Sequence, residues 1–198
     1  APAPGDARPL AGDVDGDGRD DLVLVGRVAG TQVWVARSEG DHFAAPAEWH
    51  ASFAHPGEAL ALGDVDADGR ADLVRFTCGT EGDVWVARSD GARFGAEARW
   101  HDTFCFGDET PGVGDLDRDG QADLVVVNHS TGDAYGAVSD GARFVGTAQR
   151  WGQGVVAQDA DAAFGDADGD GRTDVVGLGR GGGETVTVAR STGSALGA

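Results

Sequence analysis

The stretch Asp13-Val-Asp-Gly-Asp-Gly-Arg-Asp-Asp21-Leu determines how this chain is organised, because three further copies follow it at a constant spacing of 51 residues. The later copies begin at Asp64, Asp115 and Asp166. A fixed period of this length indicates a repeat protein. We therefore expect a single repeat domain over residues 1–198, with repeats at about 1–49, 50–100, 101–151 and 152–198.

Each loop has the composition of a site for a hard cation. Carboxylates at positions 1, 3, 5 and 9 surround one point, a glycine at position 6 permits a sharp turn, and the carbonyl of position 7 can serve as a neutral ligand. Dense all-oxygen coordination suits Ca²⁺ better than Mg²⁺, which requires stricter octahedral geometry. We predict up to four Ca²⁺ ions, one per repeat, held by Asp13, Asp15, Asp17, Arg19 and Asp21; Asp64, Asp66, Asp68, Arg70 and Asp72; Asp115, Asp117, Asp119, Gln121 and Asp123; and Asp166, Asp168, Asp170, Arg172 and Asp174.

Other interpretations of the loops are less well supported by the residues. Zinc and copper favour His or Cys, which the loops lack. An EF-hand has a glutamate at position 12, where this chain has Leu24, Arg75, Val126 and Gly177. The remaining alternative is a solvated acidic turn, because Asp and Gly are also common in turns for local reasons.

The sequence around each loop predicts short strands rather than helices. In the second repeat we expect strands at residues 58–62, 73–76, 84–88 and 93–100, with a hairpin at Ser89-Asp-Gly91. Four short antiparallel strands in about 50 residues form the blade of a β-propeller. The fold class expected is therefore all-β, a propeller of four four-stranded blades.

The chain resembles the FG-GAP/VCBS-type calcium-binding repeats found in integrin α-subunit propellers and in many bacterial secreted proteins. The resemblance rests on the Gly-Asp-x-Asp-x-Asp-Gly-x-x-Asp cores, which begin at Gly12, Gly63, Gly114 and Gly165. It implies a β-propeller with calcium in the hairpin between the first and second strands of each blade. It does not imply a particular ligand, because such propellers serve adhesion, sugar binding and scaffolding.

The blade count leaves the closure of the ring open. The simplest expectation is a closed four-bladed propeller. The alternative is part of a larger seven- or eight-bladed ring or of a dimeric assembly. An unclosed arc would expose two sheet faces and should form a homo-oligomer.

Composition limits the partners and the setting. The net charge is −19, and four Ca²⁺ ions would leave about −11. This charge argues against binding to nucleic acid, and the lack of a long apolar stretch argues against membrane insertion. Calcium sites favour an extracellular, secreted setting. Cys78 and Cys105 fall in loops on the same side of the expected propeller, so we predict a disulfide, with two free thiols as the alternative.

Candidate ligand-binding residues gather at the ends of the fourth strands. Trp rings with adjacent polar groups can stack on sugars, but such large rings more often pack between blades. No catalytic constellation is visible, so we assign no catalytic residues. We expect a binding module for carbohydrate or extracellular protein, with a secreted enzyme of the hydrolase or lyase type, or a self-assembling structural module, as the alternatives. The candidate residues are Trp49, His50, Trp100, His101 and Trp151.

Overall fold

The computed structural model describes residues 7–26, 31–53, 55, 57–180 and 185–197. These residues form four sheets, each of four antiparallel strands in chain order, which confirms the predicted blades. Within the described residues we find no helix with the length and apolar character needed to cross a membrane.

The strands are regularly spaced along the chain. Blade 1 contains β1 (Ala7–Gly12), β2 (Asp21–Gly26), β3 (Val33–Ala36) and β4 (Ala47–His50). Blade 2 contains β5 (Ala59–Gly63), β6 (Asp72–Phe76), β7 (Val84–Ala87) and β8 (Ala98–His101). Blade 3 contains β9 (Thr110–Gly114), β10 (Asp123–Val127), β11 (Ala134–Ser139) and β12 (Phe144–Gly152). Blade 4 contains β13 (Asp161–Gly165), β14 (Asp174–Leu178), β15 (Val186–Ser191) and β16 (Leu196–Gly197).

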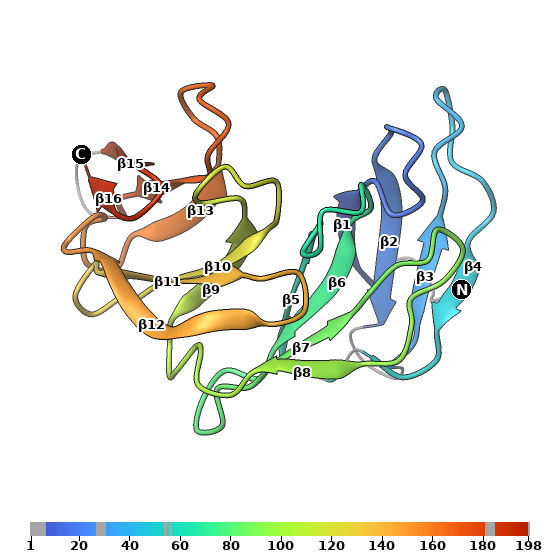
Figure 1. Ribbon diagram of the computed structural model, residues 1–198, viewed down its shortest axis with the longest axis horizontal. Helices are drawn as coiled ribbons and strands as arrows, with labels where there is room; N and C mark the ends of the chain where they lie inside the picture. Colours follow the sequence, from blue (N-terminus) through green and yellow to red (C-terminus); the bar gives the residue numbers. More distant parts are fainter. Residues whose placement is uncertain (1–6, 27–30, 54, 56, 181–184, 198) are drawn as a thin grey trace.

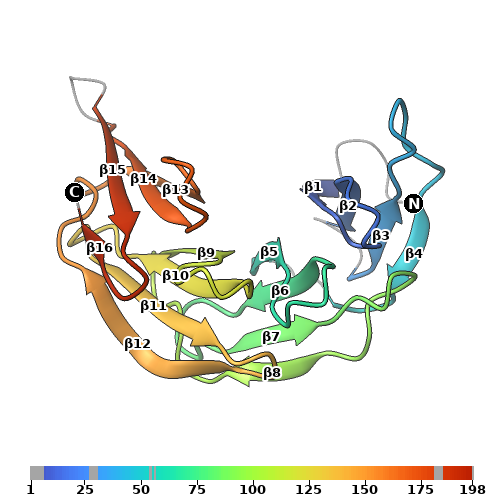
Figure 2. The same cartoon turned by 45° about the horizontal axis from the view of Figure 1, so that its top comes forward.

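The four blades form an open arc. Successive blades contact one another through their first strands, β1 with β5, β5 with β9, and β9 with β13. Blades 1 and 4 stand at opposite ends of a U whose ends are separated (Figures 1 and 2). The expectation of a closed four-bladed ring is therefore wrong, and the arc agrees with the alternative of a larger or composite propeller.

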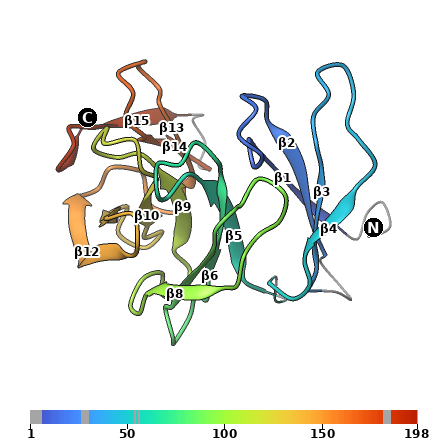
Figure 3. The same cartoon turned by 45° about the vertical axis from the view of Figure 1, so that its right-hand side comes forward.

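Apolar side chains fill the space between neighbouring blades. Each central strand turns one face to the preceding blade and the other to the following one, as the alternation of a strand requires. Figure 3 shows blade 1 standing face to face with blade 2. The core of this interface consists of Val23, Val25, Val33, Val35 and Trp49 of blade 1 with Leu60, Leu73, Ala87 and Phe94 of blade 2.

The tryptophans of the fourth strands belong to these interfaces. The Trp49 ring meets Phe94 of the next blade at 5.5 Å between centroids, and the Trp100 ring meets Phe144 at 5.4 Å. Trp151 packs in the core between blades 3 and 4. A side chain at Gly136 would come within 2.7 Å of the Trp151 ring nitrogen, so the valine found at this place in the other blades would not fit here.

The fourth strand of blade 2 is shorter than predicted. We expected a strand over residues 93–100, whereas β8 begins at Ala98. Phe94 keeps an isolated bridge to Ser89 of its own blade, and its N–H donates to the Trp49 carbonyl of the preceding blade at 3.1 Å. Residues 95–97 lie between this bridge and β8 and belong to no strand.

The predicted disulfide is present. Cys78 lies between β6 and β7, Cys105 lies between β8 and β9, and their Cα atoms are 4.9 Å apart. A parallel bridge between Gly79 and Phe106 adjoins it. The bond ties the connector that leaves blade 2 to a turn of the same blade.

Candidate metal centres and an inter-blade pocket

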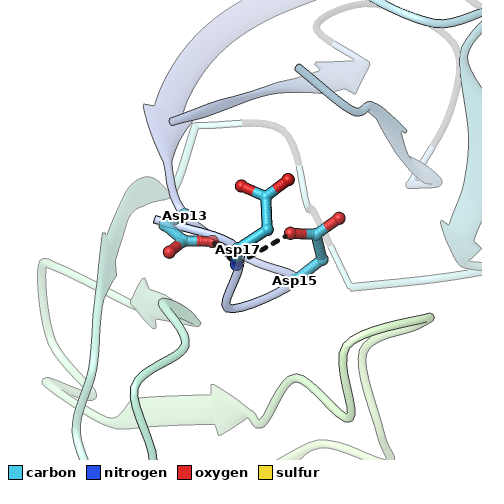
Figure 4. Close-up of side chains that lie close together, drawn as sticks. All are labelled: Asp13, Asp15 and Asp17. Atoms are coloured by element: carbon cyan, nitrogen blue, oxygen red, sulfur yellow. Dashed lines mark hydrogen bonds between the residues drawn. The ribbon is translucent and has the colours of Figure 1, made fainter. Parts of the chain in front are cut away.

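The aspartate loops all join the first strand of a blade to the second. Figure 4 shows the first loop, in which Asp13, Asp15 and Asp17 lie side by side and the Asp17 N–H donates to both neighbouring carboxylates at 3.2 Å. The carboxylate of Asp13 also accepts from Gly16 and Gly18, each at 2.7 Å. The first aspartate therefore shapes the loop as well as offering oxygen atoms.

The glycine at position 6 makes the turn that the sequence predicted. Gly18, Gly69, Gly120 and Gly171 have φ angles of 85°, 85°, 90° and 85°. Only glycine adopts this left-handed conformation without steric cost. The turn brings the N–H of position 6 back to the first aspartate in every loop.

The aspartate at position 9 is buried and fixes the loop to its own blade. In blade 2, one oxygen of Asp72 accepts from Val65 N–H at 3.3 Å and the other from Ser89 N–H at 2.8 Å. Burial raises the pKa of Asp72 and of Asp123 to about 7, since the charged form loses its hydration. A cation near these carboxylates would favour their charged form.

Three carboxylates converge in each loop. Each places one oxygen within 4.8 Å of the other two. In the second loop Asp66 Oδ1 is buried without a hydrogen-bond partner among the described residues, so the loop holds an oxygen that a cation would satisfy. The donor set is entirely oxygen, which fits Ca²⁺. The converging groups are Asp13, Asp15 and Asp17; Asp64, Asp66 and Asp72; Asp115, Asp117 and Asp123; and Asp166, Asp168 and Asp174.

The carboxylate at position 5 is part of the converging group in the first loop, where that residue is Asp17. In loops 2 to 4 this carboxylate lies outside the converging group, and in all four loops it pairs with the side chain of position 7. Arg70 pairs with Asp68, Gln121 donates to Asp119 at 3.0 Å, and Arg172 pairs with Asp170 at 2.7 Å. The position-7 carbonyl as a ligand stays a prediction.

A further arginine neutralises the third position in three of the loops. Arg88, which directly follows β7, lies 3.0 Å from Asp66, and Arg37 and Arg190 take the same place toward Asp15 and Asp168. In blade 3 the aligned residue is Val138. The third loop therefore has less compensating positive charge, and burial raises the pKa of Asp117 within it.

Serines whose role was not predicted from the sequence connect each of the first three loops to the next blade. The hydroxyl of Ser89 donates to the Val14 carbonyl at 2.6 Å, and Ser139 and Ser191 donate to Val65 and Leu116 at the same distance. A backbone N–H of the next blade holds the adjacent carbonyl, as when Ala71 donates to Asp13 at 2.7 Å. We call this pair of bonds the inter-blade lock. The signal in the sequence is the serine that recurs at the same place in every repeat.

The candidate ligand-binding residues lie at the blade junctions. Trp49, Trp100 and Trp151 are buried. The Nε2–H of His101 donates to the Gly146 carbonyl at 2.8 Å, because its Nδ1 accepts from Thr103 N–H at 3.1 Å. His50 likewise accepts from Ser52 N–H at 3.2 Å. These rings and imidazoles therefore have structural partners.

One pocket does bring two of the predicted residues together at the surface. It lies between β8 and the start of β12, with a volume of about 450 Å³, within the range of small-molecule sites. Its exposed charged side chains come from both blades. The lining consists of Arg99, Trp100, His101, Asp102, Arg143, Phe144, Val145 and Gly146.

The comparisons with known proteins place the chain in a family. Residues 13–75 and 115–177 match the FG-GAP-like repeat, so the chain belongs to the FG-GAP-like repeat family. No curated protein matches the chain. Among solved structures, it is similar to an Agrocybe aegerita lectin described as recognising non-reducing terminal N-acetylglucosamine, with a TM-score of 0.71 and 25% identity over 96% of this chain and 50% of that one. The chain therefore spans about half the length of that lectin.

Proposed function

We propose that this chain is a calcium-stabilised β-propeller module that binds carbohydrate outside the cell. The observation that carries the carbohydrate assignment is the similarity to the lectin, which extends over 96% of the chain at 25% identity. The four converging carboxylate groups support the calcium assignment. The disulfide between Cys78 and Cys105 supports an oxidising, extracellular setting.

Calcium would act on stability rather than on chemistry. Bound at a loop, the ion supplies positive charge to carboxylates that otherwise repel one another. The chain's own residues do the positioning: the first aspartate holds the turn, the ninth is fixed by two backbone N–H groups, and the inter-blade lock holds the adjacent carbonyls. A loop that is held in this way stiffens the junction to the next blade.

The pocket between β8 and β12 is the site we assign to the sugar. Arg99, Asp102 and Arg143 offer donors and acceptors for hydroxyl groups, while Trp100 contributes an apolar wall. Asp102 and Arg143 are exposed, so they can bind a ligand without unfolding the junction. A mixed polar and aromatic lining of this kind suits a saccharide.

Calcium titration by calorimetry tests the metal assignment. We expect up to four sites in protein stripped with a chelator, and fewer in an Asp115→Asn/Asp117→Asn variant. The matched control is Asp108→Asn, which changes an exposed carboxylate of the connector before β9. Equal binding by all three proteins would refute the assignment to the loops.

Glycans ending in non-reducing N-acetylglucosamine are the first probe for the pocket. We expect Arg143→Ala to weaken binding at least about tenfold, because one charge-assisted hydrogen bond is worth about 1.5–3 kcal/mol. Arg93→Ala is the matched control, since Arg93 makes the same 3.4 Å pair with Asp90 that Arg143 makes with Asp140, one blade earlier. Equal loss in both variants, or binding in neither wild type nor variant, would refute the assignment.

A further inference from the structure

The two ends of the arc expose faces whose counterparts are buried inside it. We define the leading face of blade 4 as the side turned away from blade 3, where Leu178, Val186 and Val188 are 45%, 65% and 36% exposed. We define the trailing face of blade 1 as the side turned away from blade 2, where Phe43 is 52% exposed. Exposed apolar side chains grouped on one face indicate an interaction surface.

The inner interfaces show what each free face would bind. The leading face of blade 1 contributes Val25, Val33 and Val35, the counterparts of Leu178, Val186 and Val188. The trailing face of blade 2 contributes Leu73, Ala87 and Phe94, the counterparts of Leu22, Ala36 and Phe43. The free face of blade 4 and the free face of blade 1 are thus two halves of an interface that the chain already builds three times.

The two free faces also carry complementary hydrogen-bonding groups, with acceptors on blade 4 and donors on blade 1. Inside the arc, the lock uses the carbonyls of loop positions 1 and 2 on one blade and a serine hydroxyl and a position-8 N–H on the next. Blade 4 carries these carbonyls on Asp166 and Ala167, and Ala167 is exposed whereas Val14, Val65 and Leu116 are fully buried. Blade 1 carries the matching donors on Ser38 and Asp20.

We propose that the leading face of blade 4 binds the trailing face of blade 1 in a second copy of this chain, and that two arcs close one ring in this head-to-tail manner. The ends of the U do not meet, so the ring of blades is open in a single copy (Figure 2). Two arcs of four blades give eight, within the range of known propellers. This chain covers 50% of the similar lectin, so an arc of this size corresponds to about half of that longer chain.

The second copy would also complete the fourth aspartate loop. In the first three loops the next blade holds the carbonyls of positions 1 and 2, whereas the fourth loop receives these bonds only from blade 1 of a partner. This step rests on the proposed calcium binding: calcium at the fourth loop and docking of the second copy should strengthen each other. Chelation should therefore weaken the dimer.

Light scattering after size exclusion, run over a range of concentrations, tests the docking. We expect wild type in calcium to have twice the 20.1 kDa mass of the chain. Val188→Asp places a charge in the interface and should raise the dimer dissociation constant at least about tenfold. Thr187→Asp is the matched control, because Thr187 is the exposed neighbour on β15 whose side chain points to the opposite face, and it should leave the dimer intact.

Several outcomes would overturn the proposal. A monomer at every concentration would do so, as would a dimer that Val188→Asp leaves unchanged. A dimer that persists fully in chelator would overturn only the link to the fourth loop, while a failure of calcium binding in the calorimetric titration would leave the docking result standing. Circular dichroism of Val188→Asp checks that the variant retains its sheets, which we expect because the substituted side chain is exposed in the single chain.

Discussion

Blade 2, inside the arc, and blade 4, at its end, are built from the same repeat but bury it differently. Val84 and Val86 of β7 are fully buried, while Val186 and Val188 hold the same register positions in β15 and are exposed. The residue type is unchanged, so the difference comes from the neighbour that blade 2 has and blade 4 lacks within one chain. Stability in this protein should therefore depend on junctions between blades more than on single sheets.

Removal of calcium should cause the largest loss of stability, and the loss should differ between an inner loop and the loop at the end of the arc. One ligand present at a hundredfold excess over its Kd adds about 2.7 kcal/mol, and several loops add together if they bind independently. We expect chelation to lower Tm strongly. In the Val188→Asp background, at concentrations where the chain is monomeric, Asp117→Asn should cost more calcium-dependent stability than Asp168→Asn, because the third loop is locked by a following blade of its own chain and the fourth is not. Differential scanning calorimetry with and without calcium measures both. An unchanged Tm in chelated protein would refute calcium stabilisation.

Removal of an aromatic ring inside the arc should cause the second-largest loss of stability. Trp100 is 7% exposed and packs on Phe144 at the junction of blades 2 and 3. We expect Trp100→Ala to cost about 3–5 kcal/mol. Phe43→Ala at the free end should change stability by less than about 0.5 kcal/mol in the Val188→Asp background, measured at concentrations where light scattering shows a monomer.

Urea unfolding measures the free energy of unfolding that is lost in Trp100→Ala and in Phe43→Ala. Similar losses from the two aromatic substitutions would mean that the junctions do not dominate stability. A large loss from Phe43→Ala in the monomer would mean that the end of blade 1 is packed within its own chain.

The disulfide distinguishes the connector after blade 2 from the connectors after blades 1 and 3. It closes a loop over a sequence separation of 27 residues. Loop-closure entropy predicts that Cys78→Ser with Cys105→Ser costs about 2–4 kcal/mol. Thermal unfolding of the double variant against wild type measures the loss, and reduction of wild type should reproduce it. A difference between the two would point to an effect of the serines themselves.

Much of the fold was predictable because the repeat is strict. The spacing from Asp13 to Asp166 predicted four blades, and the alternation in Val84-Trp-Val predicted the third strand. The Ser89-Asp-Gly91 signal predicted a hairpin turn, in which Gly91 has a φ of 83°. These are local properties, in which nearby residues determine the backbone. The converging carboxylates follow from the same local pattern.

The parts that could not be predicted depend on the next blade. Phe94 was expected to lie in a continuous strand, but it keeps only an isolated bridge to Ser89 and packs on Trp49 of the neighbouring blade. Ring closure was expected from the blade count, but curvature is set by packing at every junction. The role of Ser89 was missed because its acceptor lies 75 residues away in the sequence.

The smallest expected effect tests the lock itself. Ser139 donates to the Val65 carbonyl at 2.6 Å, and the Gly141 N–H donates to the same hydroxyl at 3.1 Å. Ser139→Ala should cost about 1–2 kcal/mol, because it leaves a buried carbonyl without its partner. Ser38 has the equivalent N–H contact from Gly40 at 3.4 Å but no preceding blade in its own chain. Ser38→Ala should therefore be nearly neutral in the Val188→Asp monomer, as judged by urea unfolding.

The same Ser38→Ala change should behave differently in the dimer. If blade 1 docks on blade 4 of a second copy at both junctions of the ring, each Ser38 hydroxyl gains an Ala167 carbonyl. The substitution should then weaken association by roughly thirtyfold to a thousandfold, since each of the two junctions loses about 1–2 kcal/mol. Sedimentation at graded concentrations measures this. If Ser38→Ala leaves the stability of the monomer unchanged but weakens association, the inter-blade lock also forms at the junction between copies. A substitution that is neutral in both would confine the lock to the three junctions inside the arc.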